Sequence, residues 1–223
     1  MNKITRSIFT FLAIGVAGYA IVQYFIIGVD HAGLVQMKLL FLSKLSSFWY
    51  IMLFTHIIGS VVALAIGPFT LSSKFREKNI LRHKRLGKLY IIGILFGGIS
   101  GLYLAFYATG GIAGKLGFSL LAIFWLISAY QAIVRIKANR VNEHQQWMIR
   151  NYSLTFAAVT LRIWLPLFML LLGLERFELS YAIIAWLAWV PNIIIAELFI
   201  QRKLRSKPVR TISKDSMEIV KLD

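Results

Sequence analysis

The sequence predicts an all-α integral membrane protein, a bundle of about six transmembrane helices with both termini in the cytoplasm. Three observations lead to this prediction. Hydrophobic residues make up 58% of the chain and its mean hydropathy is +0.71, more than a soluble domain usually shows. Apolar runs of about 20 residues, long enough to cross a hydrocarbon core of roughly 30 Å, recur along the chain. Short basic segments separate these runs.

The apolar runs predict the helices of a single transmembrane domain over residues 1–200. The first run, at about 8–29, exceeds the apolar core of a signal peptide, about 7–15 residues, so we expect an uncleaved helix. Further helices are predicted at about 47–71, 89–108, 116–134, 151–172 and 179–200. Residues 201–223 form a basic cytoplasmic tail whose composition predicts disorder. Residues 30–46 fit a loop, a re-entrant segment or an interfacial helix.

Topology explains the net charge of +16 better than nucleic-acid binding does, because the basic residues lie in short segments between apolar runs. With the N-terminus inside, 20 of the 25 Lys and Arg fall on the cytoplasmic side and 4 on the other, the remaining one being Arg162. The positive-inside rule therefore orients the bundle. The expected partner is a lipid bilayer with anionic headgroups at the cytoplasmic face, and no nucleic acid.

Several chemistries are excluded by what the chain lacks. Without cysteine there is no disulfide, thiolate nucleophile, iron–sulfur ligation or haem attachment through cysteine. The signatures of α/β-hydrolases, zinc proteases and P-loop NTPases are also missing. Glu197 has no second carboxylate within a predicted span, so we expect it to form an ion pair with Arg150 or Lys88 rather than to act in catalysis. No catalytic residue is identified.

Two polar residues, His56 and Arg162, fall near the middle of predicted helices. Each lies about twelve residues, or roughly 18 Å of rise, from the cytoplasmic end of its helix, so the two should lie at similar depth and share one cavity. A charged Arg at that depth costs at least about 2.5–3.5 kcal/mol and requires a partner or water. Arg162 either fixes the bundle through carbonyl and hydroxyl groups or binds an anion or polar headgroup. His56 either joins two helices by a hydrogen bond or serves as a haem-iron ligand or proton carrier.

A second group of candidates lies on the cytoplasmic side. His83 and His144 each stand just before a predicted helix, among basic residues that include Arg85 and Arg150. Two facing histidines can hold a metal or haem, but the surrounding Lys and Arg suit phosphate or anionic headgroups better. The alternative is that these basic and aromatic segments simply anchor the helices at the interface.

Small residues recur every four positions along the third predicted helix, at Gly93, Gly97, Gly101 and Ala105. Such a stripe lets another helix approach closely, so helix packing is its expected role. The alternative is that the stripe leaves room for a flat ligand between helices.

The chain resembles a family of small, functionally unassigned bacterial membrane proteins with a domain of unknown function. The motifs that carry this resemblance are His56 with Gly67-Pro68, HKRLGKLY at 83–90, HQQWMIR at 144–150 and TLR at 160–162. The resemblance implies a helical multi-pass protein of the bacterial inner membrane with a shared polar site, and it supplies no reaction. A looser likeness is to b561-type cytochromes, which place one His within a helix and another at the start of the next, here His56 and His83. That family pairs histidines from non-adjacent helices at matching depth, whereas no His on the last three predicted helices matches His56.

Three functions are compatible with these residues. The first is a redox-associated protein that holds haem b or a quinone-like ligand between the second, third and fifth helices, with His56 on the iron or the quinone and Arg162 neutralising a negative charge. The second is a lipid or small-anion carrier, which paired broken helices would favour. It would bind its ligand at Arg162 and gather it at His83, His144, Arg85 and Arg150. The third is a non-catalytic membrane assembly or stress factor.

Overall fold

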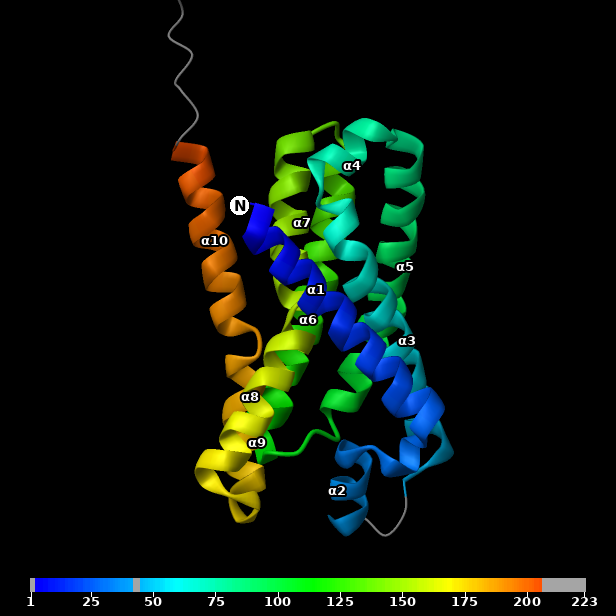
Figure 1. The fold of residues 1–223 in the computed structure, drawn as a ribbon, viewed down its shortest axis with the longest axis vertical. Coiled ribbons are helices and arrows are strands. Elements are labelled where there is room, and N and C mark those ends of the chain that lie inside the picture. The colour runs from blue at the N-terminus through cyan, green and yellow to red at the C-terminus, as the bar shows by residue number, and fades with distance from the viewer. Residues whose placement is uncertain (1–2, 42–44, 206–223) are drawn as a thin grey trace, which may run out of the picture.

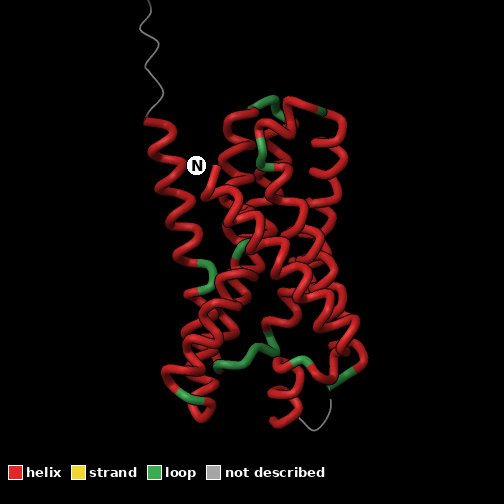
Figure 2. Tube along the Cα trace, viewed as in Figure 1, coloured by secondary structure: helices red, strands yellow, loops and turns green. Residues whose placement is uncertain are grey.

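The computed structural model describes residues 3–41 and 45–205. In these ranges the chain is helical and has no strand, and six helical stretches are long and apolar enough to cross a membrane. The predicted fold class is therefore confirmed. Figure 1 shows the six stretches running alternately up and down one bundle, and Figure 2 shows the loops that connect them at its two ends.

The first half of the chain begins with a long helix that changes its winding before it ends. Its elements are α1 (Lys3–Ile21), continued by the π-helix η1 (Val22–Gly28) and the 3₁₀ turn η2 (Val29–His31), then α2 (Gly33–Phe41), α3 (Ser47–Thr70), α4 (Ser73–Lys78) and α5 (Ile80–Ala105). The elements of the second half are α6 (Gly111–Lys137), α7 (Val141–Thr155), α8 (Ala157–Leu172), the 3₁₀ turn η3 (Leu174–Arg176), α9 (Phe177–Leu187) and α10 (Val190–Arg205). The α7–α8 pair forms one membrane-length stretch, and α9–α10 with η3 forms another.

Two helices begin well before the apolar runs that predicted them. The side-chain oxygen of Asn79 accepts a hydrogen bond from the Arg82 N–H at 2.9 Å, so α5 begins at Ile80 rather than at about 89. Helix α7 likewise begins at Val141 instead of about 151. Lys, Arg, Glu and Gln have good helix propensity, so the basic segments continue the helix beyond its apolar part.

The last two predicted helices are each interrupted, which was not predicted from the sequence. The chain passes from α7 to α8 at Phe156, and from α9 to α10 at Ala188 and Trp189. Pro191 has no N–H to donate to the preceding turn, which explains the second interruption. Helix α10 then continues to Arg205, past the predicted end at about 200. The rest of the predicted tail, residues 206–223, lies outside the described residues.

The segment that follows the first stretch folds into a short helix, α2, at the end of the bundle opposite α4 (Figure 1). Lys38 of this helix is buried, and its ammonium group donates a hydrogen bond to the carbonyl oxygen of Tyr107, just after α5. This bond ties α2 to the α5–α6 turn. Residues 42–44 of the same segment lie outside the described residues.

The bundle is built around the α3–α5 pair, which has the most extensive contact, and around α6, which packs on both α5 and α7. Helix α1 crosses the bundle diagonally and packs on α3 (Figure 1). A fully buried polar network joins α5, α6 and α7. The Tyr90 hydroxyl donates to Asn151 Oδ1 at 2.6 Å, and Asn151 Nδ2 donates to the Trp125 carbonyl oxygen at 2.8 Å. This network fixes the spacing of the three helices.

The basic segments gather at one end of the bundle. Figure 1 shows the start of α1, helix α4, the α6–α7 turn and the end of α10 together at this end, which we call the basic end. Helix α4 alone carries Lys74, Arg76 and Lys78. The opposite end carries α2, the α5–α6 turn and the turn between α8 and α9.

Candidate functional site

His56 lies on α3 and its ring points at α5. Its Nδ1 atom is 2.7 Å from the carbonyl oxygen of Gly97. A carbonyl oxygen only accepts hydrogen bonds, so Nδ1 carries the proton of the neutral imidazole and donates it. The other ring nitrogen, Nε2, then has a free lone pair and makes no hydrogen bond within the described part of the chain. A backbone carbonyl that fixes the tautomer in this way is typical of histidines that ligate a metal or accept a proton.

The small-residue stripe of α5 makes room for α3 and for the His56 ring. A Cβ atom at Gly101 would lie 2.8 Å from His56 Nδ1, and a Cβ at Gly93 would lie 2.8 Å from the Gly59 carbonyl oxygen. A Cβ at Gly97 would meet the backbone N–H of Ser60 at 3.2 Å. Ala105, at the end of the stripe, is buried. Since α3 itself occupies the stripe, a flat ring has no place between α3 and α5.

Arg162 lies on α8 and has no carboxylate partner among the described residues. Its Nη1 donates to the Ala158 carbonyl oxygen at 2.8 Å, and its guanidinium carbon lies 5.6 Å from the centre of the Tyr19 ring. The ion pairs of the described residues all involve other arginines, with Glu143 or Glu197. A cation at this depth with only a carbonyl and a ring face as partners is under-compensated.

Tyrosines from two other helices complete the surroundings of Arg162. Tyr24 of the π-helix η1 and the buried Tyr181 of α9 both lie within electrostatic range of the guanidinium, and so does His56. The hydroxyl groups of Tyr24 and Tyr181 make no hydrogen bond within the described residues. We call these four residues together with Tyr19 the Arg162 cluster. A π-helix is rare and often marks a functional site.

Sequence reasoning brought His56 and Arg162 together but missed the tyrosines. These come from the first and last membrane stretches, and their spacing along the chain carries no signal. The π-helix that contains Tyr24 likewise has no marker in the sequence. An aromatic residue in a membrane helix is ordinary, so only the tertiary arrangement distinguishes these tyrosines.

The two helix interruptions lie side by side, and a side chain next to each one donates a hydrogen bond to a backbone carbonyl oxygen at the other. The Thr160 hydroxyl donates to the Ala188 carbonyl oxygen, and Asn192 Nδ2 donates to the same oxygen at 2.9 Å and to the Ser153 carbonyl oxygen at 3.3 Å. Backbone groups released by a break inside a membrane must find such partners. Arg162 follows Thr160 by two residues, so the Arg162 cluster begins next to these interruptions.

The middle and end of the chain, residues 53–200, match the model of a family described as Predicted membrane protein (DUF2306). This match covers more than half of the chain. The chain belongs to this family. No curated protein and no solved structure matches it. With six membrane-length helical stretches in its described part, this DUF2306 protein is a multi-pass membrane protein. The matched segment contains His56 and Arg162, whereas Tyr19 and Tyr24 precede it.

The DUF2306 chain places its second candidate group at the basic end. His83 and His144 lie within electrostatic range of each other. Arg85 is exposed on α5. Arg150 is already engaged, because its Nη2 lies 2.8 Å from Glu197 Oε2 and its guanidinium stacks 4.8 Å above the Trp147 ring centre. The predicted ion pair between Glu197 and Arg150 is therefore confirmed. Because Glu197 balances the positive charge of Arg150, this arginine attracts an anionic ligand only weakly.

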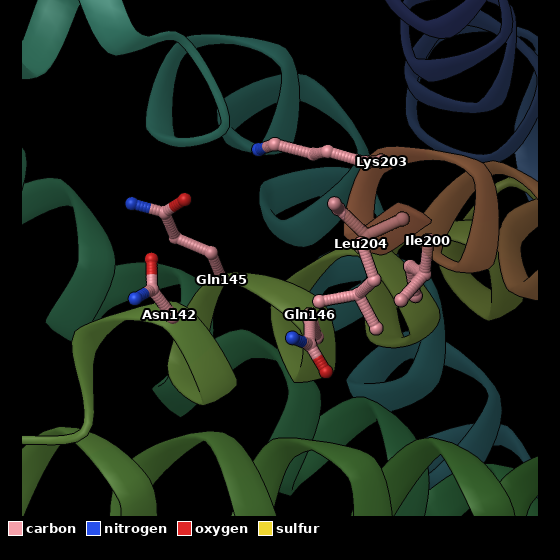
Figure 3. Close-up of a pocket in the computed structure, with 7 residues that line it drawn as sticks. Asn142, Gln145, Gln146, Ile200, Lys203 and Leu204 are labelled. Atoms are coloured by element: carbon pink, nitrogen blue, oxygen red, sulfur yellow. The ribbon is translucent and has the colours of Figure 1, made fainter. Parts of the chain in front are cut away.

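A small pocket of the DUF2306 chain opens between α7 and α10 at the same end (Figure 3). Its lining residues are Asn142, Gln145, Gln146, Ile149, Ile200, Lys203 and Leu204. The side-chain amides offer hydrogen bonds, but the pocket has no histidine or carboxylate. Its one ionisable lining residue is Lys203, so the lining offers no set of metal ligands.

Proposed function

We propose that the protein is a redox-associated membrane protein that binds a quinone or quinol at the Arg162 cluster, between α1, α3, α8 and α9. The observation that carries this proposal is the hydrogen bond from His56 Nδ1 to the Gly97 carbonyl oxygen. It leaves Nε2 as a bare acceptor, which suits the hydroxyl of a quinol. Arg162 supplies the complementary group, a cation that stabilises a quinone oxygen as negative charge develops on it.

The tyrosines support the same ligand class. Tyr24 and Tyr181 offer hydroxyl groups that form no hydrogen bond with the described residues, and the Tyr19 ring gives an apolar surface on which a quinone can stack. Quinones are apolar rings with polar oxygens at two ends, so a site of aromatic walls with a few polar groups fits them. A quinone is uncharged, so the site needs no carboxylate within the bilayer to balance the charge of the ligand.

Haem b is the alternative ligand in the redox hypothesis, and the Arg162 cluster fits it less well than it fits a quinone. Nε2 of His56 suits an axial iron position, and Arg162 suits a propionate. A second axial histidine at this depth is not found, since the other described histidines, His31, His83 and His144, lie near the ends of the bundle. A haem at His56 would therefore have one protein ligand and would have to lie outside the α3–α5 contact.

The test is ligand analysis of the detergent-purified full chain. We expect quinone in the organic extract of the wild-type protein and quenching of its intrinsic fluorescence by added decylubiquinone. His56→Ala and Arg162→Gln should weaken this binding at least tenfold, while the matched control His31→Ala should bind like wild type. Equal binding by all four proteins, or none by any, would overturn the proposal. Oxidised and dithionite-reduced spectra of the same samples, from cells supplied with haem precursor, report haem, which His56→Ala should remove if it binds there.

A lipid or small-anion carrier is the second candidate, and the paired interruptions of α7–α8 and α9–α10 favour it. Discontinuous helices next to a cation recur in transporter binding sites. In vesicles of phosphatidylcholine and phosphatidylglycerol, fluorescent phosphatidylglycerol should then exchange between leaflets with wild-type protein and much more slowly with Arg162→Gln. Exchange at the rate of protein-free vesicles would exclude a carrier for this lipid.

We also propose that the basic end faces the cytoplasm of a bacterial cell and contacts anionic headgroups there. The clustering of Lys and Arg at one end of the bundle supports this orientation, because basic loops are retained on the cytoplasmic side of the inner membrane.

A further inference from the structure

His83 and His144 occupy matched positions in two helices that start at the same end of the bundle. Each is the fourth residue of its helix, α5 from Ile80 and α7 from Val141. Each backbone N–H closes the first helical turn onto the capping residue, from His83 to the Asn79 carbonyl oxygen at 3.1 Å and from His144 to that of Arg140 at 2.9 Å. Figure 1 shows both helices descending from the basic end. The two imidazoles therefore enter the bundle at the same level.

Helices α5 and α7 stand on either side of α6 and do not pack closely on each other; side chains bridge the space between them. Farther from the basic end than the histidines, a hydrogen bond of 2.6 Å from the Tyr90 hydroxyl to Asn151 Oδ1 joins the two helices. His83 and His144 each lie seven residues, or about two helical turns, before Tyr90 and Asn151, so they occupy the same faces of α5 and α7 nearer the basic end. No hydrogen bond joins the two rings within the described residues.

The nitrogens of the two rings are poised for a ligand. His144 Nδ1 lies 2.8 Å from the Ala132 carbonyl oxygen, so it carries the proton and leaves Nε2 with a free lone pair. His83 Nδ1 is buried and has no hydrogen-bond partner. A buried, unpartnered ring nitrogen is rare because it loses its hydrogen bond to water, and an absent ion or ligand is one explanation for it. Two unrelated observations thus leave one nitrogen available on each ring.

We propose that His83 and His144 form a bis-imidazole site for a transition metal at the basic end. No third His, Asp or Glu joins them among the described residues, so the metal must be one for which two protein ligands suffice. Haem iron is such a metal, because the porphyrin supplies four ligands, and Cu(I) is another, because it accepts low coordination numbers. The positive charge of Arg76 near His83 repels a divalent ion about twice as strongly as monovalent Cu(I), so Cu(I) is the less disfavoured free ion. Haem propionates would instead be stabilised by it.

This site is separate from the Arg162 cluster, since it uses different residues at the end of the bundle. The experiment is metal analysis of the detergent-purified full chain, together with its reduced absorption spectrum and a titration with Cu(I) against a chromophoric Cu(I) chelator. We expect either one haem with a low-spin spectrum or one bound Cu(I) per chain. His83→Ala and His144→Gln should each lower occupancy at least tenfold. The Gln amide can still donate to Ala132, so the second variant preserves the local fold.

His56→Ala is the matched control, because it removes a histidine of the other site. It should keep the metal while it loses quinone, and the two proposals therefore fail independently. Wild-type protein that binds neither haem nor Cu(I) would overturn the proposal, and so would metal that His83→Ala and His144→Gln retain in full. Inorganic phosphate that protects the protein from thermal unfolding only when both histidines are present would assign the site to an anion instead.

Discussion

His56 on α3 donates a hydrogen bond from Nδ1 to the carbonyl oxygen of Gly97 on α5, 2.7 Å away. This single contact joins the two most closely packed helices and also fixes the imidazole tautomer. The glycines at 97 and 101 are what allow the ring to come so near the α5 backbone. Packing and ligand chemistry are therefore coupled at one position.

Replacing Gly101 with alanine should disturb this contact. The new Cβ would lie 2.8 Å from His56 Nδ1, so we expect a loss of stability of about 1–3 kcal/mol and weaker quinone binding. Gly87→Ala is the matched control on the same helix, because nothing lies within 4 Å of its Cβ position. It should stabilise the protein by about 0.5–1 kcal/mol. Thermal unfolding in detergent compares them, and equal unfolding temperatures would contradict this packing.

The buried network of Tyr90 gives a second prediction. Tyr90→Phe leaves Asn151 Oδ1 without its donor, and both residues are fully buried. The expected loss is about 1–3 kcal/mol, the usual result of an unsatisfied buried polar group. Tyr130→Phe serves as control, since Tyr130 is 65% exposed. A Tyr90→Phe protein as stable as wild type would show that Asn151 has another partner.

The ion pair between Arg150 and Glu197 should contribute little to stability. Their side chains are 20% and 41% exposed, so solvent screens the attraction. A double-mutant cycle with Arg150→Gln and Glu197→Gln should give a coupling of about 0–1 kcal/mol that falls as salt is added. A coupling well above this range would mean that the pair is shielded by lipid.

The absence of cysteine allows a direct test of orientation. Ser73→Cys lies on α4 at the basic end and Glu175→Cys lies on η3 at the opposite end, and both positions are exposed. In intact bacterial spheroplasts a membrane-impermeant maleimide should label only the Glu175→Cys protein, with lysed cells as the control for reactivity. Labelling of Ser73→Cys in intact spheroplasts would reverse the proposed orientation.

Much of the architecture was predictable because a bilayer imposes it. A chain must bury every backbone polar group within a helix to cross hydrocarbon, so apolar runs translate directly into spans. The ends of helices were less predictable. The basic residues after Asn79 form the first turns of α5, where hydropathy gives no signal, and the carbonyl groups released before Pro191 are satisfied by Asn192 and Thr160, which meet only in the folded bundle.

The sequence by itself determined that this is a six-span helical membrane protein, and it singled out His56, Arg162, His83 and His144 as residues out of place in apolar or interfacial segments. Only the tertiary structure decided what surrounds them. It brought Tyr24 and Tyr181 within electrostatic range of Arg162, filled the glycine stripe with α3, and set His83 and His144 at matched positions of two helices. The physical reason is that hydrophobicity is a local property of the chain, whereas ligand geometry depends on which helices become neighbours and in what register they pack.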